Sequence, residues 1–322
     1  MSRGIVQELK SIAHSYESIK TEIGKVIVGQ EESVTFLCAA LLSDGHLLLE
    51  GVPGLGKTLL VQSFARASGL SFSRIQFTPD LLPQDITGSE IIDESRGKRE
   101  FRFVKGPVFA NMLLADEINR TPPKTQAALL EAMQERQVTS YGTTHPLPAP
   151  FLVMATQNPI EHEGTYPLPE AQLDRFMFHL KLGYPSLDEE TTIAQTNAFA
   201  KIDTVKPVIH EREIRRMQAV IREVPVGKAA VEYAVRIVRA SRPDTDAAAK
   251  IKSYIAYGAG PRASQYLILA AKAYAAIHGN DVVNKKEIDA VLPSVLRHRV
   301  IFNFQGLAEG YTFQDVLAWI RA

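Results

Sequence analysis

The chain has 322 residues, enough for about two domains that each bury a hydrophobic core. Its 36 basic and 36 acidic residues give a net charge of +0, so no broad basic surface announces a nucleic-acid partner. No apolar run reaches the roughly 18 residues of a membrane span, and the single cysteine, Cys38, lies in an apolar stretch. We therefore expect no membrane span, a cytoplasmic location, and a Cys38 side chain that serves as a small core residue.

The first half of the chain predicts alternating helices and strands. Residues 1–24 place apolar side chains at helical spacing, and a second helix is expected after residue 30. Short apolar strands are predicted at 47–50, 74–77, 112–115, 151–156 and 176–180, with helices between them. Because such strands form parallel sheets that are covered on both faces, we predict an α/β fold.

A phosphate-binding motif follows the first strand directly. Residues 51–58 fit the pattern G-x-x-x-x-G-K-[ST] of loops that bind ATP or GTP, and a helix is predicted at 59–67. Glycines let backbone N–H groups point at phosphate oxygens, while the lysine reaches the β- and γ-phosphates and the threonine hydroxyl binds Mg²⁺. We expect nucleotide contacts from the whole loop: Gly51, Val52, Pro53, Gly54, Leu55, Gly56, Lys57 and Thr58. The motif alone does not choose among kinases, GTPases, transporters and mechanical ATPases.

Two predicted hairpins interrupt this pattern. One lies within 86–104, where Ile91-Ile92 and the alternating residues 99–104 flank a turn-rich segment at 93–98. The other lies within 136–150 and turns at Gly142. A hairpin that leaves an α/β core usually serves a ligand or a partner, although a passive surface decoration remains an alternative.

Polar side chains follow two of the predicted strands. Asp116 and Glu117 end the strand at 112–115, where Asp116 can hold Mg²⁺ and Glu117 can deprotonate the water that attacks the γ-phosphate. Asn158 follows the next strand and can orient that water with a neutral amide, with Thr156 and Gln157 as weaker candidates. The alternatives are a helix cap for the two acids and a plain Asn-Pro turn for Asn158.

Helices dominate the rest of the chain, and two arginines stand out. Helices are predicted at 187–200, 210–222, 226–241, 261–278 and 284–297, with no strand after 186, so we divide the chain into domains at 1–184 and 185–322.

Arg175 precedes the last predicted strand and can meet the charge that develops on a γ-phosphate, even in a neighbouring subunit. Arg262, in the first turn of a helix, opposes the helix dipole, so we expect an anion or an acid to compensate it. Ordinary surface salt bridges are the alternative for both.

The order of these elements and the sequences of their motifs resemble those of the AAA+ ATPases, and among them the MoxR family. The runs that carry the likeness are Val28-Gly29-Gln30 and residues 51–58, 116–124, 126–135 and 164–176. The resemblance implies a P-loop αβα core with two β-hairpin inserts, an all-helical lid, and ATP with Mg²⁺ between neighbouring subunits of a ring, expected to be a hexamer.

The resemblance also implies roles for individual residues. Val28, Gly29 and Gln30 would contact the nucleotide, and Thr58 and Asp116 would bind the metal. Glu117 would activate water, Asn158 would be the first sensor, Arg175 the finger that acts on a neighbouring subunit, and Arg262 the second sensor. The two hairpins match inserts of the AAA+ branch that also holds magnesium chelatase subunits and the replicative helicases of archaea. The lid is displaced in that branch, so Arg262 could serve its own nucleotide or a neighbour's.

The function that the resemblance implies is chaperone-like remodelling of a protein client, with a von Willebrand factor A domain protein as partner. A motor subunit of the magnesium-chelatase type is the main alternative. A nucleic-acid motor is less favoured, because the hairpin within 136–150 carries a single arginine, although the hairpin within 86–104 is more basic. A binding switch without turnover is disfavoured by the paired acids.

Overall fold

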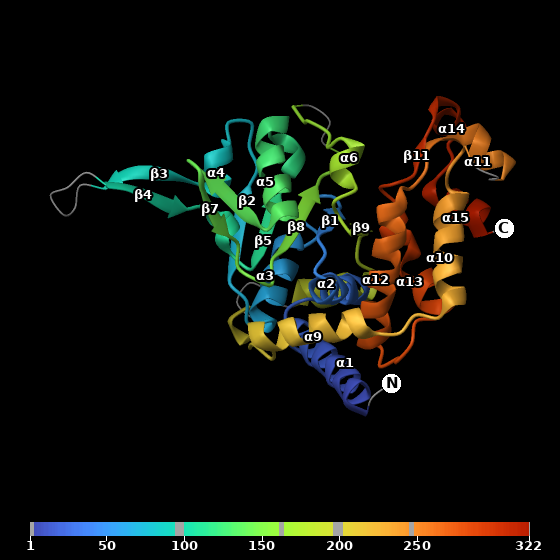
Figure 1. Cartoon of the computed structure of the whole chain (residues 1–322), viewed down its shortest axis with the longest axis horizontal. Coiled ribbons are helices and arrows are strands. Elements are labelled where there is room, and N and C mark those ends of the chain that lie inside the picture. The colour runs from blue at the N-terminus through green and yellow to red at the C-terminus, as the bar shows by residue number, and fades with distance from the viewer. Residues whose placement is uncertain (1–2, 94–99, 161–163, 196–201, 245–247, 322) are drawn as a thin grey trace.

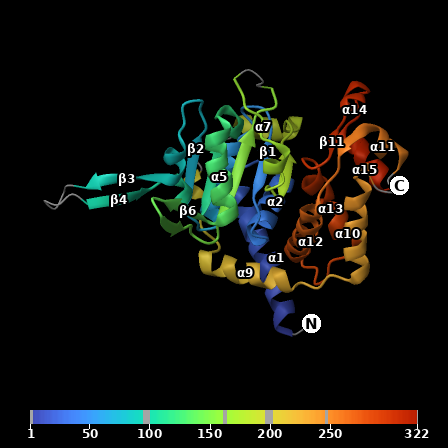
Figure 2. The same cartoon turned by 45° about the horizontal axis from the view of Figure 1, so that its top comes forward.

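The computed structural model describes residues 3–93, 100–160, 164–195, 202–244 and 248–321. Figure 1 shows an α/β body, a group of C-terminal helices on one side of it, and a long hairpin that projects from the other side. The hairpin stands away from the body in Figure 2 as well.

A five-stranded parallel sheet forms the centre of the α/β body. Its order is β2 (Phe72–Gln76), β5 (Met112–Asp116), β8 (Leu152–Gln157), β1 (Leu47–Glu50) and β9 (Phe178–Lys181). The predicted α/β fold with a parallel sheet is therefore confirmed. All five strands run the same way, so the residues that follow them gather at one edge of the sheet.

Helices cover both faces because each strand sends alternate side chains to opposite sides. Leu47 and Leu49 belong to one buried cluster and Leu48 to the other. The first cluster includes side chains of α1 (Arg3–Ile23), α2 (Glu31–Leu42) and α3 (Lys57–Ala67), and the second includes side chains of α4 (Pro83–Thr87) and α5 (Pro123–Glu135).

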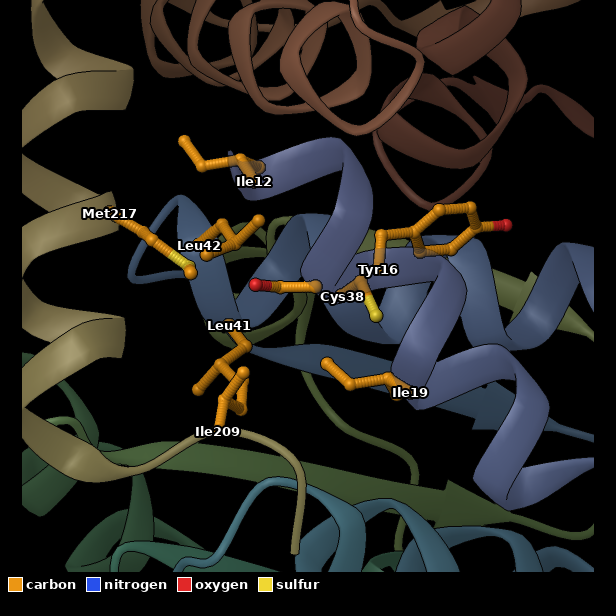
Figure 3. A pocket seen from close by; sticks show the side chains of 9 residues that line it. Ile12, Tyr16, Ile19, Cys38, Leu41, Leu42, Ile209 and Met217 are labelled. Atoms are coloured by element: carbon orange, nitrogen blue, oxygen red, sulfur yellow. The ribbon is translucent and has the colours of Figure 1, made fainter. Parts of the chain in front are cut away.

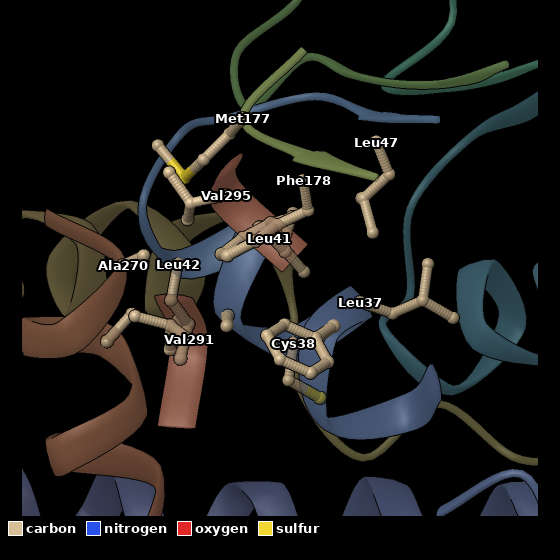
Figure 4. Packing of buried hydrophobic residues seen from close by; sticks show 14 of the residues in the cluster. Leu37, Cys38, Leu41, Leu42, Leu47, Met177, Phe178, Ala270, Val291 and Val295 are labelled. Carbon is tan, nitrogen blue, oxygen red and sulfur yellow. The ribbon is translucent and has the colours of Figure 1, made fainter. Parts of the chain in front are cut away.

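Helix α2 joins the sheet to the C-terminal helices. Figure 4 shows its apolar side chains between β9 on one side and α12 (Pro261–Ile277) and α13 (Lys285–Leu296) on the other. The rings of Phe36 and Phe178 meet edge to face with centroids 5.2 Å apart. This buried cluster crosses the predicted domain boundary after residue 184, and the division into two domains stays a prediction.

Cys38 lies in the same core, beside a small apolar pocket between α1, α2 and α9 (Glu211–Glu223). The pocket measures about 10 Å³ and is lined by residues that include Ile12, Ile19, Leu41 and Met217 (Figure 3). Only 2% of Cys38 is exposed, and burial raises the pKa of its thiol. The prediction that Cys38 is a core residue is confirmed, because a neutral thiol packs as a small hydrophobic group.

Both predicted hairpins are present. The first pairs β3 (Gly88–Asp93) with β4 (Glu100–Lys105), and its predicted tip at 94–98 lies outside the described residues. The second pairs β6 (Gln137–Ser140) with β7 (Thr143–Pro146), and Gly142 takes a φ of 80° in its turn. Phe103 of the first hairpin stacks on His145 of the second with centroids 4.1 Å apart, so the two hairpins support each other at their bases.

The described residues after 186 are mainly helical and include one short strand pair. Their helices are α7 (Leu187–Gln195), α9, α10 (Lys228–Ala240), α11 (Ala249–Tyr254), α12, α13, α14 (Phe304–Ala308) and α15 (Phe313–Arg321), and short turns of helix also occur at η1 (Pro107–Phe109), η2 (Ile118–Arg120), α6 (Glu170–Leu173) and η3 (Ile202–Thr204).

The expectation of no strand after residue 186 is wrong, since β10 (Ile255–Tyr257) pairs with β11 (Ile301–Phe302). These strands are too short to show an alternating pattern in the sequence. The end of the helix predicted at 187–200 lies outside the described residues beyond 195. In the described part of the chain, no helix combines the length and apolarity that crossing a bilayer requires.

Candidate nucleotide site

The loop at residues 51–58 lies at the carboxyl end of β1 and leads into α3. Gly54 and Gly56 have φ values of 87° and 72°, a left-handed region that glycine adopts without strain. A Cβ at either position would have no other described atom within 4 Å, so both glycines border open space. The positive end of α3 points toward this space, as phosphate binding requires.

Lys57 lies close to the predicted acids. Its ammonium donates to the carbonyl oxygens of Gly51 and, at 3.1 Å, of Val52. Burial lowers the pKa of Lys57, while the carboxylates of Asp116 and Glu117 work in the opposite direction. Thr58 follows in the first turn of α3, so the two residues predicted to hold phosphate and Mg²⁺ begin the same helix.

A pocket of about 480 Å³ adjoins the loop, a volume typical of small-molecule sites. It includes residues 53–56 of the loop, Val28 and Gln30 of the predicted motif, and Ile193 of α7. The complete apolar part of its lining is Val26, Ile27, Val28, Leu55, Leu59, Leu182 and Ile193, with Pro53, Pro185 and Tyr184 beside them. Such walls suit the flat, weakly polar base of a nucleotide.

Gln30 and Gly29 shape this pocket. Gln30 Nε2 donates to the Leu55 carbonyl at 3.0 Å, while Gln30 Oε1 is buried and lacks a hydrogen-bond partner among the described residues. Gly29 has a φ of 70°, the left-handed region that favours glycine, and a Cβ there would lie 2.2 Å from the side-chain oxygen Oε1 of Glu189 in α7. The buried, unpartnered oxygen and the apolar walls fit a nucleotide with its base in this pocket.

Asp116 ends β5 and is held on both sides. Its Oδ1 accepts a 2.6 Å hydrogen bond from the Thr156 hydroxyl, which in turn accepts from the Glu117 N–H at 2.8 Å. Its Oδ2 accepts from Arg74 Nη2 at 2.7 Å. Thr156, a weaker candidate in the sequence, therefore fixes the two acids relative to each other.

Glu117 has a φ of 57°, the left-handed conformation that costs a side chain free energy and often marks functional sites. Gln76 Nε2 donates to Glu117 Oε2 at 2.7 Å, and Arg120 Nη1 lies 3.1 Å from the same oxygen. Arg74 Nη2 also donates to Gln76 Oε1 at 2.8 Å. Arg74 and Gln76 are not among the residues predicted from the sequence, where their only signal is their spacing of two on one face of β2.

Asn158 lies at the same edge of the sheet as the loop. It is buried, follows β8 directly, and its Oδ1 accepts from the Ile160 N–H at 3.2 Å, so the side chain also forms the turn that the alternative reading predicted. Gln157 lies beside Glu50 in the sheet register, and its carbonyl accepts from the Gly51 N–H at 3.3 Å.

Arg175 and Arg262 lie together at the opposite edge of the sheet. Both line a pocket of about 170 Å³ that also includes Asp44, Gly45 and His46, the residues that precede β1. Arg262 Nη1 lies 2.9 Å from Asp174 Oδ2, which is the compensating acid that the sequence led us to expect. No carboxylate of the described residues forms a salt bridge with Arg175.

The structure does not bring these arginines to the loop of the same chain. The loop lies at the carboxyl end of β1, and the pocket that contains the arginines lies at its amino end. β1 has four residues. At about 3.3 Å of rise per residue, that strand alone separates the two edges by about 13 Å.

Known proteins are similar to this chain over most of its length. The family described as "ATPase family associated with various cellular activities (AAA)" matches residues 46–178, and the AAA lid domain matches 247–319. The chain is 48% identical to Chaperone MoxR1 of Mycobacterium tuberculosis over 307 residues, which cover 95% of this chain and 81% of that protein. It is 29% identical to Protein MoxR of Methylorubrum extorquens over 314 residues, covering 87% and 85% of the two chains.

A solved structure is similar over nearly the whole length. The crystal structure of a candidate ATPase from Cytophaga hutchinsonii matches with a TM-score of 0.90 and 40% identity, covering 98% of this chain and 96% of that one.

Proposed function

The chain belongs to the MoxR family of AAA+ ATPases, and we propose that it hydrolyses ATP in sites shared between neighbouring copies of a ring, a hexamer by family likeness. In this proposal the cycle remodels a protein client in the cytoplasm, together with a von Willebrand factor A domain protein.

One observation carries the proposal: the groups that a hydrolytic site needs are divided between opposite edges of the sheet. The loop, Asp116, Glu117 and Asn158 gather at the carboxyl edge, whereas Arg175 and Arg262 lie before the amino edge. A single chain therefore presents half of a site on each edge. A second copy that sets its arginine edge against the loop would complete the site, and repetition of that contact closes a ring.

Within one copy, the residues at the carboxyl edge divide the work. Lys57 and the backbone N–H groups of residues 54–58 would hold the phosphates. Thr58 and Asp116 would hold Mg²⁺, which would neutralise phosphate charge. Glu117 accepts a proton from the attacking water at Oε2 once it leaves Gln76 and Arg120. The Asn158 amide orients that water without adding charge.

The neighbouring copy contributes the cations. Arg175 meets the negative charge that develops on the γ-phosphate, since its guanidinium has no carboxylate partner among the described residues. Arg262 shares its pocket, so we propose that it too serves the neighbour's nucleotide. Its ion pair with Asp174 holds the guanidinium beside Arg175.

The hairpin β3–β4 is the surface that we propose for client contact. Ile92 and Phe101 lie opposite each other on it and are 58% and 77% exposed. Exposed aliphatic and aromatic side chains suit apolar polypeptide segments. The hairpin projects from the body in both views, where a client can reach it (Figures 1 and 2).

Coupled measurements of ATP hydrolysis and particle mass test the shared site. We expect the rate per chain to rise with protein concentration and to level off where mass photometry shows a ring, because isolated copies lack Arg175 at their own loop. The Lys57→Ala variant should bind ATP poorly and stay inactive at every concentration. A rate per chain that is constant down to concentrations where only single copies exist would refute the shared site.

A further inference from the structure

The backbone around Arg175 is held by side chains from the C-terminal helices. Arg299 Nη2 donates to the carbonyl oxygens of Asp174 and Phe176, at 2.9 and 2.6 Å, and Arg299 Nη1 donates to that of Met177 at 3.3 Å. The Tyr266 hydroxyl donates to the remaining carbonyl, that of Arg175 itself, at 3.4 Å. Every carbonyl from residue 174 to 177 therefore accepts a hydrogen bond from α12 or from the residues that follow α13.

The side chain next to Arg175 is fixed by the same group. Asp174 Oδ1 lies 2.7 Å from Arg299 Nε, while Asp174 Oδ2 lies 2.9 Å from Arg262 Nη1. His298, which is buried, donates from Nε2 to the Phe176 carbonyl at 2.9 Å. One carboxylate thus joins the buried arginine to the second arginine of the pocket.

Arg299 can do this because it is rigidly placed. Only 2% of its side chain is exposed. Its guanidinium lies over the aromatic ring of Tyr266, 5.2 Å from the ring centroid. A buried charge is tolerated when it is paired and hydrogen-bonded throughout, and Arg299 Nη1 also reaches the Val295 carbonyl of α13. The planar guanidinium spreads five N–H donors over several acceptors, which a lysine ammonium cannot reproduce.

We infer that Arg299 is a positioning residue for Arg175: it fixes the segment that carries the proposed finger and joins its position to α13. Arg299 lies beneath that segment and touches no part of the loop or its acids. This inference rests on the proposed role of Arg175 toward a neighbouring copy.

The test uses the full chain with Arg299→Met, Arg299→Lys, Arg175→Ala and, as a control, Arg321→Met, which removes an exposed arginine of α15. We expect kcat to fall at least tenfold in Arg299→Met, with KM for ATP within twofold, and to fall less in Arg299→Lys. Arg321→Met should retain the unaltered rate. Circular dichroism and particle mass show which variants fold and assemble. If Arg299→Met does not fold, the kcat of Arg299→Lys tests the inference instead.

Mixing separates positioning from a general structural role. Arg299→Met copies have an intact loop, so they should regain activity when mixed with Lys57→Ala copies, whose arginine edge is intact. They should regain none with Arg175→Ala copies, because every arginine edge in that mixture is defective. An unaltered rate in Arg299→Met beside an inactive Arg175→Ala, or no recovery with Lys57→Ala, overturns the positioning inference alone. Full activity of Arg175→Ala would remove the finger role and this inference with it.

Discussion

The side-chain amide of Gln76 donates a 2.7 Å hydrogen bond to Glu117, across two neighbouring strands of the sheet. Glu117 also lies 3.1 Å from Arg120. The carboxylate that we propose activates water is therefore held by two donors on its own chain, and it must exchange them for water before it can accept a proton.

Glu117→Gln should separate binding from turnover. The amide keeps the size of the side chain but cannot accept a proton, so we expect kcat to fall by a factor on the order of 10²–10⁴. The dissociation constant for ATP, measured with a fluorescent analogue, should stay within about threefold, because Lys57, Thr58 and Asp116 remain. Glu131→Gln, on the exposed side of α5, is the matched control. Near-normal turnover in Glu117→Gln would remove Glu117 from the proposed role.

Arg74 is paired with Asp116, so it would compete with Mg²⁺ for that carboxylate in the proposed site. Its guanidinium lies 2.7 Å from Asp116 Oδ2, and its side chain is 43% exposed, so the pair is of modest strength. We expect Arg74→Met to lower the Mg²⁺ concentration for half-maximal hydrolysis by roughly two- to fivefold, the range that such a partly exposed pair allows. A magnesium titration at saturating ATP measures this. A requirement that stays equal or increases would show that Arg74 does not oppose the metal.

Stability should decline as the pH falls below the ordinary histidine range. Burial lowers the pKa of His46 to about 3 and also lowers that of His298. Below about pH 6.5 the unfolded chain binds protons at these positions while the folded chain does not, so the free energy of unfolding falls by up to ~1.4 kcal/mol per pH unit for each. Glu50, whose pKa is lowered to about 2 mainly by a hydrogen bond from His179, changes stability only below about pH 4.5 and does not contribute in this window.

Urea unfolding at about pH 7.5, 6.5 and 5.5 in constant salt measures that slope. His46→Gln should lower the slope of unfolding free energy against pH by the amount that one proton contributes, because a glutamine does not titrate. The slopes of the two proteins are compared, not their absolute stabilities. Identical slopes in the two proteins would mean that His46 is not held neutral by the fold.

The sequence predicted the chemistry that follows strands but not the contacts between distant segments. Asp116, Glu117 and Asn158 were found because each comes directly after an apolar run, and parallel strands bring such positions to one edge. Arg74 and Gln76 are ordinary polar residues of a partly exposed strand, and only the register that places Gln76 beside Asp116 reveals their role. Arg299 and Asp174 are 125 residues apart, and no local pattern joins them.

The ends of strands are predicted well where a local apolar run marks them, and poorly where contacts between distant segments decide them. The strands β1, β5 and β8 agree with the predicted ones to within one residue, since each begins with a run of buried apolar side chains. The last strand begins at Phe178 rather than at 176, because Phe176 still donates to the Leu173 carbonyl in the turn after α6. The pair β10–β11 depends on a contact between segments about 45 residues apart, which the local sequence does not encode.

The most direct test of the central claim is a mixing experiment with Arg175→Ala and Lys57→Ala. Each variant alone should hydrolyse ATP at a small fraction of the unaltered rate, because one lacks the proposed finger and the other lacks the phosphate-binding lysine. When the two are mixed and co-assembly is verified by particle mass, activity should recover, since sites between an intact loop and an intact arginine edge then form. Verified mixed assemblies that show no recovery at any ratio would contradict a site completed by a neighbouring copy.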